Sequence, residues 1–232
     1  MNQSNTFLLE KLFNFIDIFH QNRIGNYIKR LKVDIIIDVG AHKGEFAKYV
    51  LKIKKIKKIF CFEPQKKIFL ILSKKFKKEK KIYIFNYALD KIQSKKIIYI
   101  NKHTYASTLC KFNRKSLYLK LRNLVQNNKD NYLYKDIIET DTIDSIFIKK
   151  KLKHILLKID VEGYEINVLK GAKKMIEDNK IKYILVEHQF TNYYYNNSKI
   201  NTIKFLKKNN FKKMKSFIYP LFNFADVLYE KF

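Results

Sequence analysis

The segment Ile35-Ile36-Ile37-Asp38-Val39-Gly40-Ala41-His42-Lys43-Gly44-Glu45-Phe46 decides the fold class of this chain. An apolar β-branched run ends in an acid, and two glycines four residues apart follow before the pattern becomes helical. This order is typical of a parallel strand that enters a tight turn and continues as a helix. Gly40 permits the turn, and Gly44 lets the helix pack close to the strand. A ligand at such a turn lies at a helix N-terminus, so the segment predicts a nucleotide-type cofactor site.

A second predicted strand, residues 58–62, ends in Glu63, which follows Gly44 by 19 residues. Dinucleotide-binding folds use about this spacing to place an acid on ribose hydroxyls. However, the middle glycine of the dinucleotide motif Gly-x-Gly-x-x-Gly is absent, because His42 stands there and would crowd a pyrophosphate. The pattern therefore favours a methyl donor, which has a ribose and no pyrophosphate.

Two further segments follow the same plan of an apolar strand with polar residues at its exit. One is residues 82–90, which end in Leu89-Asp90. The other is residues 155–165, which contain Asp160-Val161-Glu162-Gly163-Tyr164-Glu165 and are followed by Leu169-Lys170-Gly171-Ala172. Strands that alternate with helices predict a parallel sheet with right-handed connections.

Taken together, these segments resemble the FkbM family of S-adenosylmethionine-dependent methyltransferases. The resemblance is carried by the glycine turn 38–44, by Phe62-Glu63-Pro64, by residues 157–165 and by residues 169–172. It implies an α/β, Rossmann-like class I methyltransferase fold, with a mostly parallel seven-stranded sheet, helices on both faces and an added N-terminal helix. It also implies S-adenosylmethionine as cofactor and O-methylation of a sugar, glycan or related metabolite.

The cofactor needs backbone donors and acids for its amino-acid tail, an acid for its ribose and an apolar slot for its adenine. The glycine turn and Asp38 suit the tail, Glu63 suits the ribose diol, and Asn86 and Asp90 suit the adenine edge. Ser107 lies in a loop where the family usually has a serine-bearing segment near the cofactor. The predicted cofactor-binding residues are Asp38, Gly40, Ala41, Gly44, Glu63, Asn86, Asp90 and Ser107.

Methyl transfer to a hydroxyl needs a positioned acceptor and a base or a metal. Asp160 leaves the fourth strand of the predicted core, and His188 leaves the fifth. Glu162 follows Asp160 on the same side if the chain stays extended; its structural alternative is to cap the following helix. The predicted catalytic residues are Asp160, His188 and Glu162, and a divalent metal would be held by Asp160 and Glu187.

At 232 residues, the chain is predicted to be one methyltransferase domain, 1–232. It would consist of an N-terminal helical extension at 1–31, a cofactor-binding core at 33–189, and a helix with two antiparallel strands at 190–232. Further expected elements are an extra strand at 95–100, a single helix at 165–179 and a basic segment at 111–130 without clear periodicity. The N-terminal helix would pack on the domain, lie on a membrane surface or form a homodimer contact.

The net charge of +28 admits three explanations. Lys, Ile, Asn, Phe and Tyr are all abundant, and all have AT-rich codons, so compositional bias is the first. An anionic substrate or membrane surface is the second, and nucleic acid is the third. Arginine, whose planar fork suits bases and phosphates, supplies only four of the 49 basic residues, which makes nucleic acid an unfavoured partner.

The two cysteines, Cys61 and Cys110, suit free thiols in a reducing compartment, and no signal peptide or membrane span is recognised. The expected location is therefore cytoplasmic. The leading function is a metabolite or polysaccharide O-methyltransferase. The alternatives are an RNA or protein methyltransferase, favoured by charge alone, and a non-catalytic protein on a methyltransferase fold.

Overall fold

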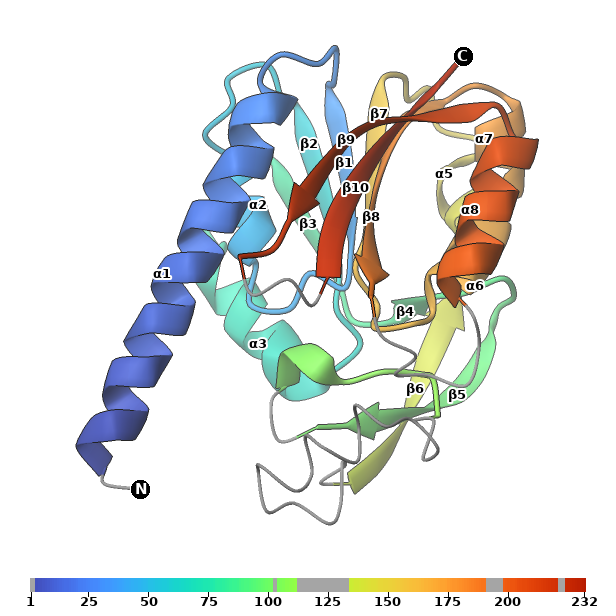
Figure 1. Cartoon of the computed structure of the whole chain (residues 1–232). Helices are drawn as coiled ribbons and strands as arrows, with labels where there is room; N and C mark the ends of the chain where they lie inside the picture. Colours follow the sequence, from blue (N-terminus) through green and yellow to red (C-terminus); the bar gives the residue numbers. More distant parts are fainter. Residues whose placement is uncertain (1–2, 102–103, 112–133, 191–197, 221–223) are drawn as a thin grey trace.

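A computed structural model describes residues 3–101, 104–111, 134–190, 198–220 and 224–232 (Figure 1). The side chains of the N-terminal helix are described from Ile16 onward. The loop residue His103 and residues 112–130 of the basic segment lie outside the described residues.

The main sheet has seven strands in the order β3-β2-β1-β7-β8-β10-β9. The strands are β1 (Ile35–Val39), β2 (Lys58–Phe62), β3 (Ile82–Phe85), β7 (Ile155–Ile159), β8 (Ile181–Gln189), β9 (Phe211–Ile218) and β10 (Phe224–Lys231). The first five in the sheet order are parallel, and β10 is antiparallel to both of its neighbours. The predicted mostly parallel seven-stranded sheet is confirmed.

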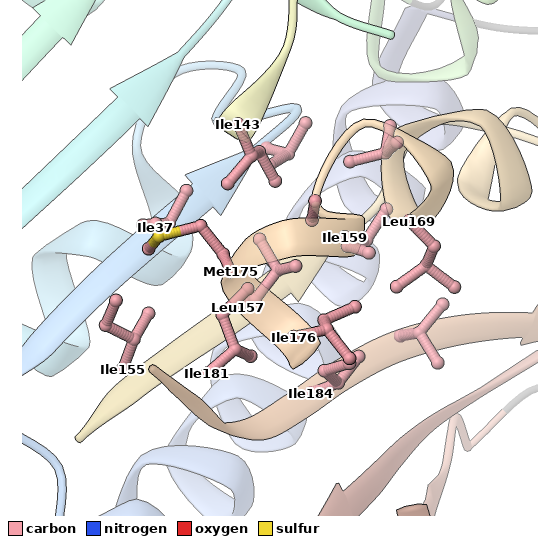
Figure 2. Packing of buried hydrophobic residues seen from close by; sticks show 14 of the residues in the cluster. Ile37, Ile143, Ile155, Leu157, Ile159, Leu169, Met175, Ile176, Ile181 and Ile184 are labelled. Carbon is pink, nitrogen blue, oxygen red and sulfur yellow. The ribbon is translucent and has the colours of Figure 1, made fainter. Parts of the chain in front are cut away.

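Helices cover both faces of this sheet (Figure 1). One face carries α1 (Gln3–Ile28), α2 (Glu45–Val50) and α3 (Lys66–Lys75), and the other carries α5 (Ile143–Phe147), α6 (Glu165–Lys170), α7 (Lys173–Glu177) and α8 (Ser198–Lys208). Figure 2 shows the hydrophobic core between the sheet and the second set of helices, where Met175 and Ile176 of α7 pack on Ile37, Leu157 and Ile184 of the sheet. Fully buried β-branched strands of this kind are typical of a parallel sheet between two helical layers.

The predicted single helix at 165–179 is two helices, because the chain breaks at Gly171. A Cβ atom at Gly171 would lie 2.0 Å from the carbonyl oxygen of Asp90, so the backbone passes too close to its neighbour for a side chain. Close approach of backbones is a common reason for glycine at such a position.

A second, three-stranded sheet lies at the carboxyl edge of the main sheet, low in Figure 1. Its order is β4-β6-β5, formed by β4 (Ala88–Leu89), β5 (Ser94–Ile100) and β6 (Tyr134–Asp141), and the 3₁₀ turn η1 (Thr104–Ala106) follows β5. Only the strand at 95–100 was predicted. The pairing of Ala88 with Thr140 joins segments about fifty residues apart, which no local pattern reports.

The C-terminal half of α1 packs on the main sheet. Ile24 and Ile28 are buried in the core, and the buried His20 Nε2 lies 2.8 Å from Asp226 Oδ2 on β10. The Tyr219 hydroxyl donates to Asp17, which adds a contact near the start of β10. Within the described residues, no helix combines the length and the apolar character that crossing a bilayer requires.

Candidate cofactor and active site

A cleft of about 670 Å³, counted to its open mouth, lies between the carboxyl edge of the main sheet and the small sheet. Its walls come from the ends of β1, β2 and β7, from β4 and β5, and from the segment after η1. The lining residues are Val39, Gly40, His42, Phe62, Glu63, Pro64, Gln65, Ala88, Leu89, Ile98, Thr104, Ser107, Thr108, Leu109, Asp160, Val161 and Tyr164.

The glycine turn contains three left-handed backbone positions: Gly40, His42 with φ of 47°, and Gly44. Gly40 has φ of 79°, and a Cβ atom there would lie 1.9 Å from the carbonyl oxygen of Asp160. Gly44 has φ of 74°, and its Cβ would meet Leu72 and Phe76 at 2.7 and 2.4 Å. Gly44 therefore allows close packing against α3, not against the strand as predicted. Gly40 lines the cleft without a side chain, which leaves its backbone open to the amino-acid tail of the expected cofactor.

Glu63 points into the cleft at the end of β2 and is only 2% exposed. Its carboxylate accepts the backbone N–H of His42 at 3.0 Å and that of Gln65 at 2.8 Å. Each oxygen keeps a second acceptor position, so the pair fits a ribose diol. Burial raises the pKa of Glu63 to about 7, although these N–H groups work against the rise. The carboxylate thus titrates near neutral pH.

The small sheet is tied to the main sheet across the cleft by side chains around η1. His42 Nε2 lies 2.8 Å from the Thr104 hydroxyl, and the Gln65 amide donates to the Thr104 carbonyl oxygen at 3.0 Å. Ser107, predicted at the cofactor, lines the cleft and donates to Gln65 Oε1 at 3.2 Å. Thr108 donates to the Glu162 carbonyl oxygen at 2.6 Å. The predicted serine-bearing loop is therefore a wall of the cleft.

Asn86 and Asp90 do not line the cleft, although Ala88 and Leu89 between them do. The Asn86 amide donates to the carbonyl oxygens of Glu63 and Pro64, both at 3.0 Å, and so shapes the exit of β2. Asp90 is fully buried; it accepts from the Tyr164 hydroxyl at 3.0 Å, and Lys96 Nζ lies 2.7 Å away. The cleft is lined instead by apolar residues, among them Ala88, Leu89, Ile98 and Leu109.

Asp38 also differs from its predicted place at the cofactor tail. It is fully buried beneath the turn, and its carboxylate lies 3.3 Å from Nζ of Lys158 on the neighbouring strand β7. Burial alone would lower the pKa of Lys158, but Asp160 and Asp38 raise it well above its usual value. Asp38 therefore holds a buried cation, and Ala41, also buried, continues the turn without lining the cleft.

Three acids gather where β7 and β8 end. Asp160, Glu162 and Glu187 each offer a carboxylate oxygen within 4.8 Å of the others. Lys158 Nζ lies 3.1 Å from Asp160 Oδ2, and the Gln189 amide donates to Glu162 at 2.7 Å and to Glu187 at 3.3 Å. Burial, Asp160 and Glu162 raise the pKa of Glu187 well above its usual value. The N-cap residue of the helix that follows is Tyr164, not Glu162, and it makes no side-chain capping hydrogen bond; Glu165, the first residue of that helix, accepts the Gly163 N–H at 2.8 Å.

His188 lies on the other face of β8 from these acids. Successive side chains on a strand alternate, so His188 shares the face of Ile184 and Val186. It is 3% exposed, lies outside the cleft lining, and its Nε2 is 3.0 Å from the Tyr229 hydroxyl on β10. Burial lowers the pKa of His188 to about 4. The structure therefore separates His188 from Asp160, and the predicted base does not reach the cleft.

Several site residues had no assignment from the sequence. Gln65 and Thr104 both line the cleft. The sequence offered one indication for each: Gln65 lies two residues after Glu63, and Thr104 lies in the same loop as Ser107. Lys158 had a clearer one, since a lysine inside an apolar strand must have a counter-charge when it is buried. Tyr164 lines the cleft from the segment after Asp160.

A family model described as the methyltransferase FkbM domain matches residues 38–213. Among solved structures, the methyltransferase domain of bacterial CtHen1-C is 11% identical with a TM-score of 0.52, over 93% of this chain and 98% of that one. Fibrillarin of Aeropyrum pernix with natively bound S-adenosyl-L-methionine is 13% identical with a TM-score of 0.46, over 86% of this chain and 67% of that one. The first likeness concerns the fold alone. The comparison with curated proteins found no match.

Proposed function

The chain belongs to the FkbM methyltransferase family and uses S-adenosylmethionine, and on that premise we propose that it methylates a hydroxyl oxygen of a sugar, glycan or related metabolite. The observation that carries the proposal is the meeting of the Gly40 turn, Glu63 and Asp160 in one cleft. Bound S-adenosylmethionine supplies an electrophilic methyl group on its sulfonium.

In this proposal, the chain's own residues orient the cofactor along the cleft. The Gly40 turn holds the amino-acid tail, Glu63 accepts hydrogen bonds from the ribose hydroxyls, and the slot beside Ala88 and Leu89 takes the adenine. Asp160 lies beside the turn, because Gly40 nearly touches the Asp160 backbone. The methyl group would therefore face Asp160 and the space toward Glu162 and Glu187.

Asp160 is the proposed acceptor base. Its side chain is one-third exposed, whereas His188 is buried on the opposite face of the sheet. Lys158 fixes one carboxylate oxygen at 3.1 Å and leaves the other to accept the proton of a sugar hydroxyl. Glu162, held by Gln189, would accept a hydrogen bond from a neighbouring hydroxyl and orient the ring. Carboxylates paired with amides are well suited to polyhydroxyl ligands, which offer many donors.

A divalent cation held by Asp160, Glu162 and Glu187 is the alternative to the base mechanism. Carboxylate oxygens are the donors that Mg²⁺ prefers, and Asp160, Glu162 and Glu187 bring three of them together. Against this, the ammonium of Lys158 already lies against Asp160 and supplies positive charge there. We propose the base mechanism, and removal of metal distinguishes the two.

The test begins with cofactor binding and ends with product analysis. Purified protein should bind S-adenosylhomocysteine in a calorimeter. With methyl-labelled S-adenosylmethionine, label should enter purified nucleotide sugars or glycans as a methyl ether, which survives mild base, and activity should persist with chelator present. Loss of activity with chelator and recovery with Mg²⁺ would assign the metal mechanism instead.

Other outcomes of the same assay contradict the proposal. Label that enters only RNA or only protein would assign the acceptor to that class of macromolecule. Binding of S-adenosylhomocysteine without transfer to any of these acceptor classes would favour a non-catalytic role, since a fold does not guarantee activity.

A further inference from the structure

The amino edge of the main sheet carries a row of exposed lysines, here called the lysine edge. Each lies at the first residue of β1, β2, β3 or β7 or within four residues before it. The members are Lys32, Lys54, Lys57, Lys58, Lys78, Lys80, Lys81, Lys151 and Lys153. Because β3, β2, β1 and β7 are neighbours in this order, the four segments lie side by side along one edge, at the top of Figure 1.

The charge of the lysine edge is largely uncompensated. The same four segments contain two acids, Asp34 and Glu79, so nine lysines exceed the acids by seven charges. Asp34 is engaged by Lys57 at 3.3 Å. In contrast, Lys55 in the same region is half-buried and donates to the Lys29 carbonyl oxygen at 2.7 Å, which uses its charge at the end of α1. Lys55 thus has a role at a helix end, whereas the lysines of the lysine edge form a cationic surface that such a role does not explain.

We infer that the lysine edge binds the surface of a bilayer that contains anionic phospholipids. Such a surface presents a diffuse negative potential that attracts clustered lysines without fixed contacts. Nucleic-acid recognition relies more on arginine forks and on aromatic platforms. Arginine is scarce in this chain, and the exposed residue Tyr83 on β3 already stacks on Phe60 and has Lys58 Nζ 5.9 Å from its ring centroid.

The position of the lysine edge is compatible with catalysis at the cleft. The strands β1, β2 and β7 each have five residues, so the two edges are separated by roughly 17 Å of sheet. A bilayer against the lysine edge would leave the mouth of the cleft open on the opposite side. This inference goes beyond the proposed methyl transfer and does not depend on it.

The experiment measures sedimentation of the full chain with vesicles at low and physiological salt. Vesicles of phosphatidylcholine with about a third phosphatidylglycerol should bind the protein, and binding should weaken with salt. Pure phosphatidylcholine vesicles should not bind it. The variant Lys54→Gln/Lys80→Gln/Lys81→Gln/Lys153→Gln should bind at least about tenfold more weakly, since each lysine near a membrane contributes several-fold in affinity.

A charge-matched control removes four exposed lysines elsewhere: Lys67→Gln/Lys170→Gln/Lys204→Gln/Lys215→Gln. It should bind almost as well as the unchanged chain, and unchanged S-adenosylhomocysteine affinity would show that both variants fold. Equal losses in the two variants, or no binding to anionic vesicles, would overturn the inference. Tighter binding to single-stranded RNA, lost only in the lysine-edge variant, would assign the surface to nucleic acid instead.

Discussion

The two edges of the main sheet carry opposite charge and use it in different ways. At the carboxyl edge, Glu63, Asp160 and Glu187 lie around the cleft, buried or half-buried, with partners within hydrogen-bond reach. At the amino edge, the lysines are exposed to solvent, and Lys57 has the half-buried partner Asp34. Helix N-termini lie near the first edge and helix C-termini near the second, so each edge carries the charge that complements the helix dipoles.

The difference lies in how strongly each charge is coupled to its surroundings. Buried groups are removed from water, so neighbours shift their pKa and their loss is costly. Exposed lysines are screened by salt and contribute little one at a time. The carboxyl edge should therefore respond to single substitutions, whereas the exposed lysines of the amino edge should respond only to several at once.

The largest expected effect is on catalysis at Asp160. Asp160→Asn should lower kcat by roughly 10²–10⁴, because the proposed base is lost, while S-adenosylhomocysteine still binds. The measurement is initial rate with the acceptor identified in the label assay, together with calorimetric affinity. Asp178→Asn makes the same chemical change at the amino edge, where Asp178 is half-exposed and 3.8 Å from Lys180, and should leave kcat unchanged. A full rate in Asp160→Asn would show that positioning alone drives transfer.

The next effect is structural and concerns the glycine turn. Gly40→Ala should destabilise the protein by at least about 2 kcal/mol and abolish cofactor binding, because it strains a left-handed backbone and collides with Asp160. Thermal unfolding and calorimetry measure the two parts. Gly25→Ala is the matched control: it lies in α1, and its nearest neighbour would be Tyr49 Cβ at 3.7 Å. It should fold at least as stably, and a loss as large as that of Gly40→Ala would contradict the account.

A smaller effect is the pH dependence of cofactor binding through Glu63. The ligand-free carboxyl has its pKa raised to about 7, and ribose donors favour its ionised form. Binding therefore releases a proton below pH 7, and affinity should weaken as pH falls through 7, by up to about tenfold per pH unit. Calorimetry of S-adenosylhomocysteine across this range measures it. Glu63→Gln should bind more weakly and lose the dependence; a slope that persists would assign it to another group.

The smallest effect distinguishes two adjacent lysines of the amino edge. Lys55→Gln should destabilise the protein by about 0.5–1.5 kcal/mol, because Lys55 donates to the Lys29 carbonyl oxygen at the end of α1. Lys54→Gln removes a charge from an exposed neighbour and should change stability by less than about 0.5 kcal/mol. Denaturant unfolding measures both. Equal losses would mean that the amino edge is coupled as tightly as the cleft.

Local sequence determined the turn, the order of strands and helices, and the acid at the end of β2. Each of these depends on contiguous residues: a β-branched run, glycines that permit positive φ, and polar residues at strand exits. The family resemblance rests on the same contiguous segments. For this reason the mostly parallel sheet and the Gly40 turn were found where they were predicted.

The tertiary structure alone decided which strand-end residues face the cleft. Alternation along β8 puts Glu187 and His188 on opposite faces, but the choice between them depends on pairing with β7, whose register shifts between Ile155 and Leu156. Asp38 pairs with Lys158 because a buried cation on the adjacent strand needs a counter-charge. The small sheet joins residues about fifty positions apart. The chemistry of each residue can be read from the sequence, but packing between distant segments decides which contacts that residue makes.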